Sequence, residues 1–305
     1  GILLPLIPAN EAVEDVWAAP PGFLNFSLKK AWLQGQIAVV NESGSAYGDS
    51  TIGNGKRIQV EFVSVNPTGP IHVGHPRGGV LGSTLANVLM AAGYDVTREY
   101  YVNDAGTQME AFYNSLYVRY AQAMGRTDIE LPATGYQGQY VIDMGEEIAR
   151  EFGATFLDKA RDEAIEELGS IGLARMLDAI RADMESLGVT YDVWFSEREL
   201  YENHQYEVAM KRLRERGFTA ERHGATWFTS STLGEDKDNV LVRSSGQPTY
   251  FAADVAYHYN KFLERKFDRV IDVWGADHQG HVQRMKSVVG ALGADPDQLT
   301  IIIYQ

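Results

Sequence analysis

The chain has 305 residues, of which 45% are hydrophobic and none is cysteine, and its formal net charge is −14. The length predicts one large domain or two, and the lack of cysteine excludes a disulfide framework and thiolate zinc sites. The negative charge argues against a general nucleic-acid binder, leaves room for a local basic surface, and suits a pocket for a cationic substrate.

Residues 1–56 are mixed in character. Pro20, Pro21 and Gly22 predict a turn, and the alternating residues that follow predict a strand over Phe23–Leu28. Residues 41–55 are rich in Gly, Ser and Asn, which indicates a linker. No basic leader typical of a signal peptide is visible, and no apolar run reaches the roughly 18 residues that cross a membrane. We therefore expect a cytoplasmic protein.

Residues 58–93 predict a strand, a tight turn and a helix. The apolar residues of 60–65 lack helical spacing and predict a buried parallel strand, which the prolines and glycine of 67–70 end. Pro76 suits a first helical turn, and Gly93 suits a helix C-terminus. Between them, apolar residues recur at helical spacing: Val80, Leu81, Leu85, Val88, Leu89 and Ala92.

Two histidines, His72 and His75, stand where this turn passes into the helix. The free N–H groups of a helix N-terminus suit a phosphate, the histidines add donors, and Gly74 lets a flat ring or a phosphate approach the backbone. An H-x-G-H tetrapeptide also arises by chance, but its place between a strand and an amphipathic helix favours a function. Three glycines inside the helix indicate close packing or close ligand approach: Gly78, Gly79 and Gly82.

A second strand is predicted over residues 96–102, so that strand, helix and strand form a βαβ unit with a right-handed parallel crossover. Asn103 and Asp104 then fall at the carboxyl edge of the sheet, where such sheets bind ligands; a turn cap explains them equally well. Residues 107–220 predict mostly helix. The helix expected over residues 200–217 carries a basic run, which indicates either a solvated face or contact with a nucleic-acid backbone. The run consists of Lys211, Arg212, Arg214 and Arg216.

Short strands are predicted at residues 225–229 and 239–243, and from Thr249 onward helices and strands alternate again. This alternation comprises a helix over 250–262, a strand over 269–274, a helix over 277–292 and a strand over 299–304. The sequence therefore predicts an α/β nucleotide-binding sheet whose two halves are separated by a mostly helical insertion.

The segment 274–281, W-G-A-D-H-Q-G-H, has the same position in the second half that His72 and His75 have in the first. We expect these two edges to face one cleft. A metal site at Asp277, His278 and His281 is the alternative, although a further clear ligand is missing.

Three residues have the chemistry to bind a guanidinium group. Tyr250 and Asp254 are four residues apart and share a helix face, where a ring can stack on a planar cation and a carboxylate can form paired hydrogen bonds with it. A core tyrosine with an exposed aspartate is the alternative. Glu61 places a charge inside an apolar strand, which is costly unless the charge is paired.

Four segments, in order and at fitting distances, resemble the catalytic region of the arginyl-tRNA synthetase family, which belongs to the class I aminoacyl-tRNA synthetases. They are V-E-F-V-S-V-N-P-T-G-P-I-H-V-G-H, whose H-V-G-H matches the H-I-G-H motif, Y-Y-V-N-D-A-G, Q-P-T-Y-F-A-A-D-V-A-Y-H and V-W-G-A-D-H-Q-G-H. A-P-P-G-F-L-N-F-S-L is similar to the end of the additional N-terminal domain of that family.

The resemblance implies an α/β fold, the Rossmann-like parallel sheet of class I synthetases (HUP type), split by a mostly helical insertion. It implies that residues 1–56 are a remnant of the N-terminal domain with a linker. Residues 57–106 would be the first half of the catalytic domain, 107–245 an inserted connective region, and 246–305 a truncated second half.

The resemblance also implies an arginine–tRNA ligase, a monomer in the cytoplasm, that activates L-arginine with Mg-ATP and transfers it to tRNA(Arg). No tightly bound cofactor and no protein-bound metal are expected. The catalytic residues implied are His72 and His75, acting on the ATP phosphates. The other ATP-binding residues implied are Pro67, Gly69, Gly74, Asp277 and His278. The arginine-binding residues implied are Glu61, Tyr250 and Asp254 for the guanidinium, Asn66 for the amino-acid end, and Gln279.

The chain also departs from the family. It lacks the second signature loop, K-M-S-K-S or a degenerate form, and the anticodon-binding domain, so we expect this piece to aminoacylate poorly or not at all. Ser245 stands where an aspartate is expected. Two other hypotheses stay open: another H-x-G-H nucleotidyl transferase, and a non-catalytic relative that binds only RNA or a partner. The second is opposed by the intact residues of the site: Glu61, His72, Gly74, His75 and Asp254.

Overall fold

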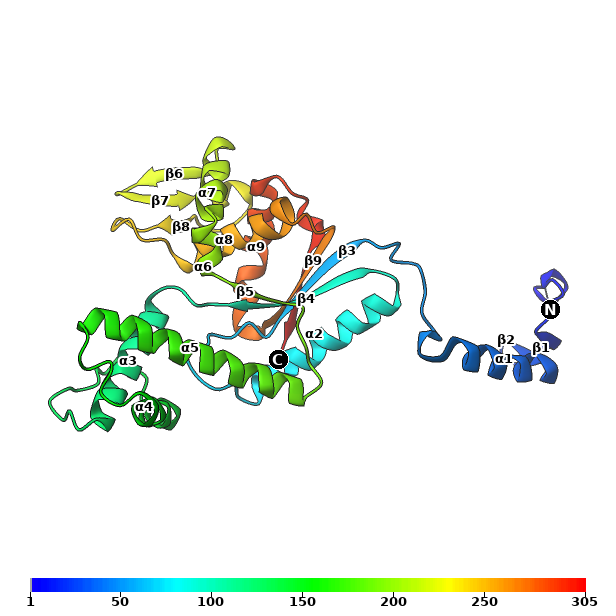
Figure 1. Cartoon of the computed structure of the whole chain (residues 1–305). Helices are drawn as coiled ribbons and strands as arrows, with labels where there is room; N and C mark the ends of the chain where they lie inside the picture. Colours follow the sequence, from blue (N-terminus) through cyan, green and yellow to red (C-terminus); the bar gives the residue numbers. More distant parts are fainter. Residues whose placement is uncertain (1) are drawn as a thin grey trace.

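The computed structural model describes residues 2–305, and its centre is a five-stranded parallel sheet with the strand order β10-β9-β3-β4-β5 (Figure 1). The strands are β3 (Arg57–Phe62), β4 (Asp95–Val102), β5 (Val193–Ser196), β9 (Arg269–Gly275) and β10 (Leu299–Tyr304). The chain runs outward from β3 in one direction and, after β5, returns beside β3 to continue in the other. That reversal between β3 and β9 is the place where doubly wound sheets bind ligands.

Helices cover both faces of this sheet, as the predicted α/β fold requires. On one face Ile58, Val60 and Phe62 of β3 pack with Ala86 of α2 (Gly74–Ala91). The alternate residues of β3 point to the other face, which is covered by α8 (Tyr250–Tyr259), the π-helical turn η4 (Asn260–Glu264) and α9 (Val282–Leu292). The predicted strands of the βαβ unit and the strands over residues 269–274 and 299–304 are confirmed.

The contact between α2 and β3 depends on small residues. A Cβ atom on Gly82 would lie 2.2 Å from Cγ of Phe62, so only glycine allows this approach. The predicted close packing of the glycines is confirmed, and the buried residues of α2 are Gly78, Gly79, Gly82, Ser83 and Ala86. The apolar stripe that predicted the helix is partly exposed instead, since Val80 and Val88 are 50% and 60% accessible.

Several predicted boundaries are wrong. The strand expected through Val65 ends at Phe62, because Val63 and Ser64 adopt φ angles of +70° and +44°. The helix expected over residues 200–217 is broken at His204 into α6 (Arg198–Glu202) and α7 (Gln205–Glu215). The helix expected from Asp277 begins as the 3-10 helix η5 (Ala276–His281). Strand β5, inside a region read as helical, was not predicted.

The segment between β4 and α8 forms two further layers. Helices α3 (Thr107–Ala123), α4 (Gln139–Phe152) and α5 (Arg161–Ser186) pack around a core of their own. Strands β6 (Thr219–Arg222), β7 (Ala225–Phe228) and β8 (Asn239–Val242) form a small antiparallel sheet, with the 3-10 helix η3 (Ser230–Leu233) between β7 and β8. Outside this segment, the 3-10 helix η6 (Pro296–Gln298) joins α9 to β10.

Two members of the basic run on α7 have a structural partner. Nε of Arg212 donates to the carbonyl oxygen of Leu292 at 2.5 Å, and Nε of Arg216 donates to that of Ala291 at 2.7 Å. Basic groups at the C-terminal end of a helix satisfy its free carbonyls and complement its dipole. These two arginines therefore stabilise the end of α9, while Lys211 forms an exposed pair with Glu215.

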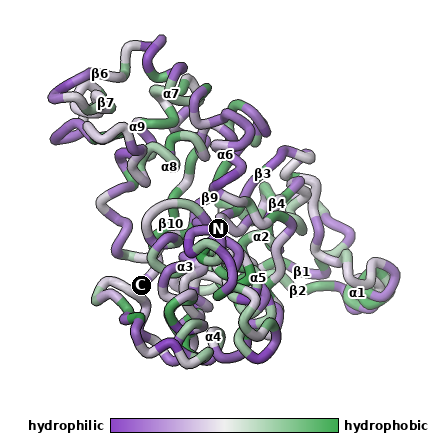
Figure 2. The backbone as a smooth tube through the Cα atoms, turned by 60° about the vertical axis from the view of Figure 1, so that its left-hand side comes forward, coloured by the Kyte–Doolittle hydropathy of each residue, from purple (hydrophilic) through white to green (hydrophobic). Residues whose placement is uncertain are grey.

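Residues 2–52 contain no buried residue and form an arm that meets the sheet domain at Ser50, whose backbone N–H donates to the carbonyl oxygen of Ala91 at 2.7 Å. It comprises η1 (Leu4–Leu6), β1 (Val13–Ala19), β2 (Phe23–Leu28), α1 (Lys30–Ser43) and η2 (Gly44–Ala46). The predicted strand over residues 23–28 is confirmed, whereas the expected linker begins inside α1. Figure 1 shows this arm away from the sheet, and Figure 2 shows hydrophobic and hydrophilic residues side by side on α1.

Within residues 2–305, every helix is too short or too polar to cross a bilayer.

Candidate active site

A cavity of about 910 Å³ opens at the carboxyl ends of β3 and β9. This volume is in the range of small-molecule sites, and the place is the reversal point of the sheet. The two strand edges therefore face one cleft, as predicted. The cavity wall includes eight of the residues predicted for the site: Glu61, Asn66, Gly69, His75, Tyr250, Asp254, Asp277 and His278.

Four other predicted residues, Pro67, His72, Gly74 and Gln279, are not among the described residues that form this wall. His72 nevertheless lies against His75, with the ring centroids 3.6 Å apart. The backbone N–H of Gly74 donates to Nδ1 of His72 at 3.2 Å, so the turn at the start of α2 fixes that ring. Burial, and then the neighbouring His72, lower the pKa of His75, which favours its neutral form.

The residues His72, His75, Asp277 and His278 surround the outer part of the cavity, and we call them the rim. Asp277 and His278 belong to η5, and their side chains are 80% and 55% exposed. No group of three or more His, Cys, Asp or Glu side chains within residues 2–305 is arranged to hold a metal ion. The alternative metal site at Asp277, His278 and His281 is therefore not supported.

A buried ionic cluster of Glu61, His258, Lys261 and Asp272 closes the cavity on its buried side, and we call it the floor. Glu61, His258 and Asp272 line the cavity, and Lys261 lies behind them. Nζ of Lys261 donates to Oε2 of Glu61 at 2.5 Å and to Oδ1 of Asp272 at 2.8 Å, and the lysine is fully buried. Nε2 of His258 lies 3.2 Å from Oδ2 of Asp272. The charge inside β3 is thus paired, as its burial requires.

The pKa values in the floor follow from this pairing. Burial raises the pKa of Glu61, against the opposing attraction of Lys261. Burial opposes ionisation of Asp272 too, but Lys261 and His258 together hold its pKa to about 2. Sequence reasoning missed Lys261 and Asp272. The only available signal was a lysine inside the predicted helix 250–262, because its partner Glu61 is 200 residues away.

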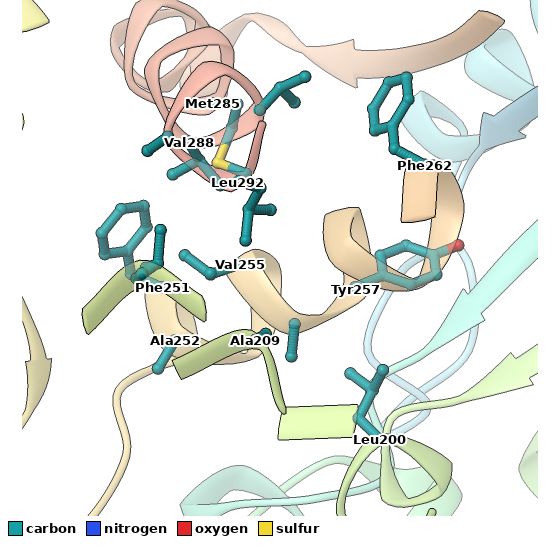
Figure 3. Packing of buried hydrophobic residues seen from close by; sticks show 14 of the residues in the cluster. Leu200, Ala209, Phe251, Ala252, Val255, Tyr257, Phe262, Met285, Val288 and Leu292 are labelled. Atoms are coloured by element: carbon teal, nitrogen blue, oxygen red, sulfur yellow. The ribbon is translucent and has the colours of Figure 1, made fainter. Parts of the chain in front are cut away.

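Helix α8 connects the floor to the rest of the wall. Figure 3 shows Phe251 and Val255 of α8 facing Met285 and Leu292 of α9, so apolar packing fixes this side of the helix. Four further residues of α8 line the cavity: Tyr250, Asp254, Tyr257 and His258. Tyr250 is 46% exposed, which is inconsistent with a core tyrosine.

Asp254 stands one turn further along α8, in the cavity wall. Burial raises its pKa, against the opposing charges of His258 and Arg284. The nearby hydroxyl of Tyr101 is buried at the same wall and has no hydrogen-bond partner among the described residues. Burial, and then the neighbouring carboxylates of Glu197 and Asp254, raise the pKa of this hydroxyl, so it stays protonated and can donate to Glu197 or to a ligand.

The two residues predicted at the end of β4 have different roles. Asn103 lines the cavity, and its Nδ2 donates to Oε2 of Glu197 at 3.2 Å. Asp104 is buried and accepts hydrogen bonds from Oγ of Ser196 and the backbone N–H of Arg198. Asp104 is thus the turn cap that the sequence left as an alternative, and it joins β4 to the loop after β5.

A parallel sheet with this strand order, a cavity at its reversal point, and paired histidines where strands pass into helices define an α/β nucleotide-binding fold. Residues 36–303 match the family model described as tRNA synthetases class I (R), catalytic domain. The chain therefore belongs to the arginyl-tRNA synthetases of class I.

Relatives in the curated proteins agree with this membership. The chain is 53% identical, over 304 residues, to the arginine–tRNA ligase of Dehalococcoides mccartyi strain CBDB1, covering 100% of this chain and 54% of that protein. It is 50% identical to that of Carboxydothermus hydrogenoformans, covering 99% and 54%. The chain thus spans about half the length of the curated relatives it matches.

Solved structures agree as well. A crystal structure from Campylobacter jejuni, described as an arginyl-tRNA synthetase, is 33% identical with a TM-score of 0.83, covering 91% of this chain and 60% of that one. The Thermus thermophilus arginyl-tRNA synthetase, at 21% identity and a TM-score of 0.67, shares the fold over 98% of this chain and 55% of that one.

Proposed function

We propose that this chain provides the amino-acid activation site of a cytoplasmic, monomeric arginine–tRNA ligase. The observation that supports this most is the acidic inner wall of the cavity, where Glu61 and Asp254 lie with Tyr250 nearby. A planar guanidinium cation can stack on the tyrosine ring and donate paired hydrogen bonds to carboxylates. Glu61 already has Lys261 beside it, so an uncharged side chain would leave the buried carboxylate of Asp254 without a cation.

In the first step the arginine carboxylate oxygen attacks the α-phosphorus of ATP. A new carboxyl O–P bond forms, the bond to the bridging oxygen breaks, and pyrophosphate leaves with the bonding electron pair. ATP enters as its Mg²⁺ complex, so the metal comes with the substrate. A ribose hydroxyl of the terminal adenosine of tRNA(Arg) then attacks the carbonyl carbon of the adenylate, forming an ester. The bond from that carbon to the phosphate oxygen breaks, and AMP leaves while the hydroxyl gives up its proton.

Each part of the site has a role in this proposal. His72 and His75 stabilise the phosphate charge, Gly74 admits the adenine, and Asn66 holds the amino-acid end. The other ATP contacts are Pro67, Gly69, Asp277 and His278, and Gln279 contributes to arginine binding. The neutral form of His75, favoured by its lowered pKa, still donates one hydrogen bond.

Substitution of Asp254 tests the specificity. Arginine-dependent pyrophosphate exchange, with tRNA(Arg) present, would be measured in a polypeptide that carries this chain at the full length of its relatives. Asp254→Ala should weaken arginine binding about 100-fold, because it removes a charge-assisted pair, and should leave the KM for ATP within about threefold. The proposal fails if the variant still selects arginine over lysine and citrulline as the parent does.

We also propose that the 305-residue chain charges tRNA poorly by itself, since it spans about half of its relatives' length. Charging of tRNA(Arg) by the isolated chain at the rate of the longer protein would contradict this.

A further inference from the structure

Three acidic residues lie side by side across the central sheet. Glu61 of β3 pairs in register with Asp272 of β9 on one side and with Glu99 of β4 on the other. Adjacent strands are about 4.8 Å apart, so the three carboxylates form one row on one face of the sheet. Asp272 and Glu99 are fully buried and Glu61 is 8% exposed. A row of three buried like charges requires cations beside it.

One continuous helical segment, α8 with η4 and the residue after it, provides these cations. Lys261 binds both Glu61 and Asp272. Arg265 donates to both oxygens of Glu99, at 2.5 and 2.7 Å, and Tyr257 donates to Oε1 of the same residue. The backbone N–H of Arg265 bonds to the carbonyl of Asn260, a five-residue π turn. Such turns are frequent at functional sites.

The two ion pairs differ in their relation to the cavity. Glu61 and Asp272 line it, whereas Glu99, Lys261 and Arg265 are not among its wall residues. Lys261 therefore holds the carboxylate of Glu61 from behind, through Oε2. Among residues 2–305, no hydrogen bond is made to Oε1 of Glu61, so this atom is left for a ligand.

We infer that Lys261 is a positioning residue for arginine selection: it fixes the Glu61 carboxylate in the row so that Oε1 is free to accept a hydrogen bond from the guanidinium. This inference rests on the proposed function. Lysine suits the position because its compact ammonium can donate to two carboxylates at once, and Nζ also lies over the ring of Tyr257, 4.2 Å from its centroid.

Without Lys261, Glu61 would lose the bond that orients it. It would also lie between two carboxylates with no cation of its own, and would then favour the protonated form. A neutral or turned carboxyl group cannot form the charge-assisted pair with a guanidinium. As a competing substrate, the free amino acid lysine has a differently shaped ammonium group and would lose less affinity from this change than arginine. The selectivity for arginine over lysine should therefore decline together with the affinity for arginine.

The test is calorimetric binding of L-arginine and of ATP to the 305-residue chain. Lys261→Met keeps the unbranched shape and removes the charge. Arginine should bind about 10- to 100-fold more weakly, as expected for the loss of a hydrogen bond between charged groups, while ATP binding stays within about threefold. The double variant Lys261→Met with Asp272→Asn removes one cation and one anion together. This double variant should regain the melting temperature of the parent chain and should still bind arginine weakly.

A matched control is available on the same helical segment. Arg265→Met with Glu99→Gln removes a buried pair of the same kind that lies outside the cavity wall, and it should leave arginine affinity within about threefold of the parent. If Lys261→Met alone does not fold, the Lys261→Met, Asp272→Asn chain carries the test.

The inference is overturned if either Lys261 variant binds arginine as the parent does, or if arginine and ATP affinity fall equally. The inference is also overturned if the double variant regains the arginine affinity of the parent. That result would mean that the role of Lys261 is to neutralise Asp272 and not to orient Glu61. If the parent chain itself binds arginine, lysine and citrulline alike, the proposed function fails, which is a different result.

Discussion

The floor and the rim of the cavity are built in opposite ways. In the floor, Lys261 and Asp272 are fully buried, and their hydrogen bonds join β3, β9 and η4. In the rim, Asp277 and His278 are mostly exposed and pair with each other across 3.4 Å. The comparison teaches that one part of the site is fixed by buried ion pairs and the other is open to solvent. In the proposed function the fixed part binds the amino-acid side chain and the open part binds the phosphates.

The largest effect on stability should follow from a change in the floor. Asp272→Ala removes the buried carboxylate that Lys261 and His258 share and leaves both without that acceptor, so the free energy of unfolding should fall by about 3–5 kcal/mol. Urea unfolding measures this directly. The control is Asp277→Ala in the rim, which should change stability by less than about 0.5 kcal/mol. Equal effects of the two changes would remove the distinction between floor and rim.

Glu197 is a buried carboxylate near the floor that lacks the pairing found for Asp272, so it separates the effect of burial on the pKa from the effect of pairing. It is buried but has no cation within ion-pair distance among the described residues, and burial raises its pKa from 4.5 to about 7. The folded state therefore binds more protons than the unfolded state between pH 4.5 and 7. Stability should decrease as the pH rises through this window, by up to about 3 kcal/mol.

Glu197→Gln should abolish that decrease, since the amide does not titrate. Unfolding free energies at pH 5 and pH 8 measure the effect, and the exposed Glu199→Gln on α6 is the control that should keep the pH dependence. An unchanged slope in Glu197→Gln would mean that Glu197 is not the titrating group.

A change in the rim should have the smallest effect on the free energy of unfolding and a large effect on the rate of pyrophosphate exchange. His75→Ala should change the free energy of unfolding by less than about 0.5 kcal/mol, because the ring is only partly buried. Loss of a donor to the phosphates should reduce arginine-dependent pyrophosphate exchange about 100-fold or more. The exposed Lys211→Ala on α7 should leave exchange unchanged. A His75 variant that is unstable but catalytically normal would reverse the comparison.

The sequence predicted the parts of this fold that depend on local patterns. The strands β4, β9 and β10 and the helix α2 are recognised by apolar runs and by Gly93 at the helix end, and the rim histidines by their place between strand and helix. Four-residue β5 was missed because it is too short to show a period after the long helix α5.

The floor was predicted only in part, because pairing between distant residues leaves no local signal. Glu61 was recognised as an unusual charge in a strand, but nothing near it in the sequence indicates Lys261. The apolar residues of α2 led to a wrong prediction of its buried face for a related reason. Gly82 lets the helix approach Phe62 closely, so the small face is buried and Val88 remains exposed.

The 200-residue separation of Glu61 and Lys261 also bears on synthesis of the protein. Ribosomes add about 5–20 residues each second, so about 10–40 seconds pass between the emergence of the two residues. During that interval Glu61 has no lysine beside it, and the neighbouring position of β9 is empty. The βαβ unit made first must therefore wait, with an open strand edge and an unpaired acid, until the second half of the domain arrives. We expect this nascent stage to be when the chain is most vulnerable to misassembly and in greatest need of chaperones.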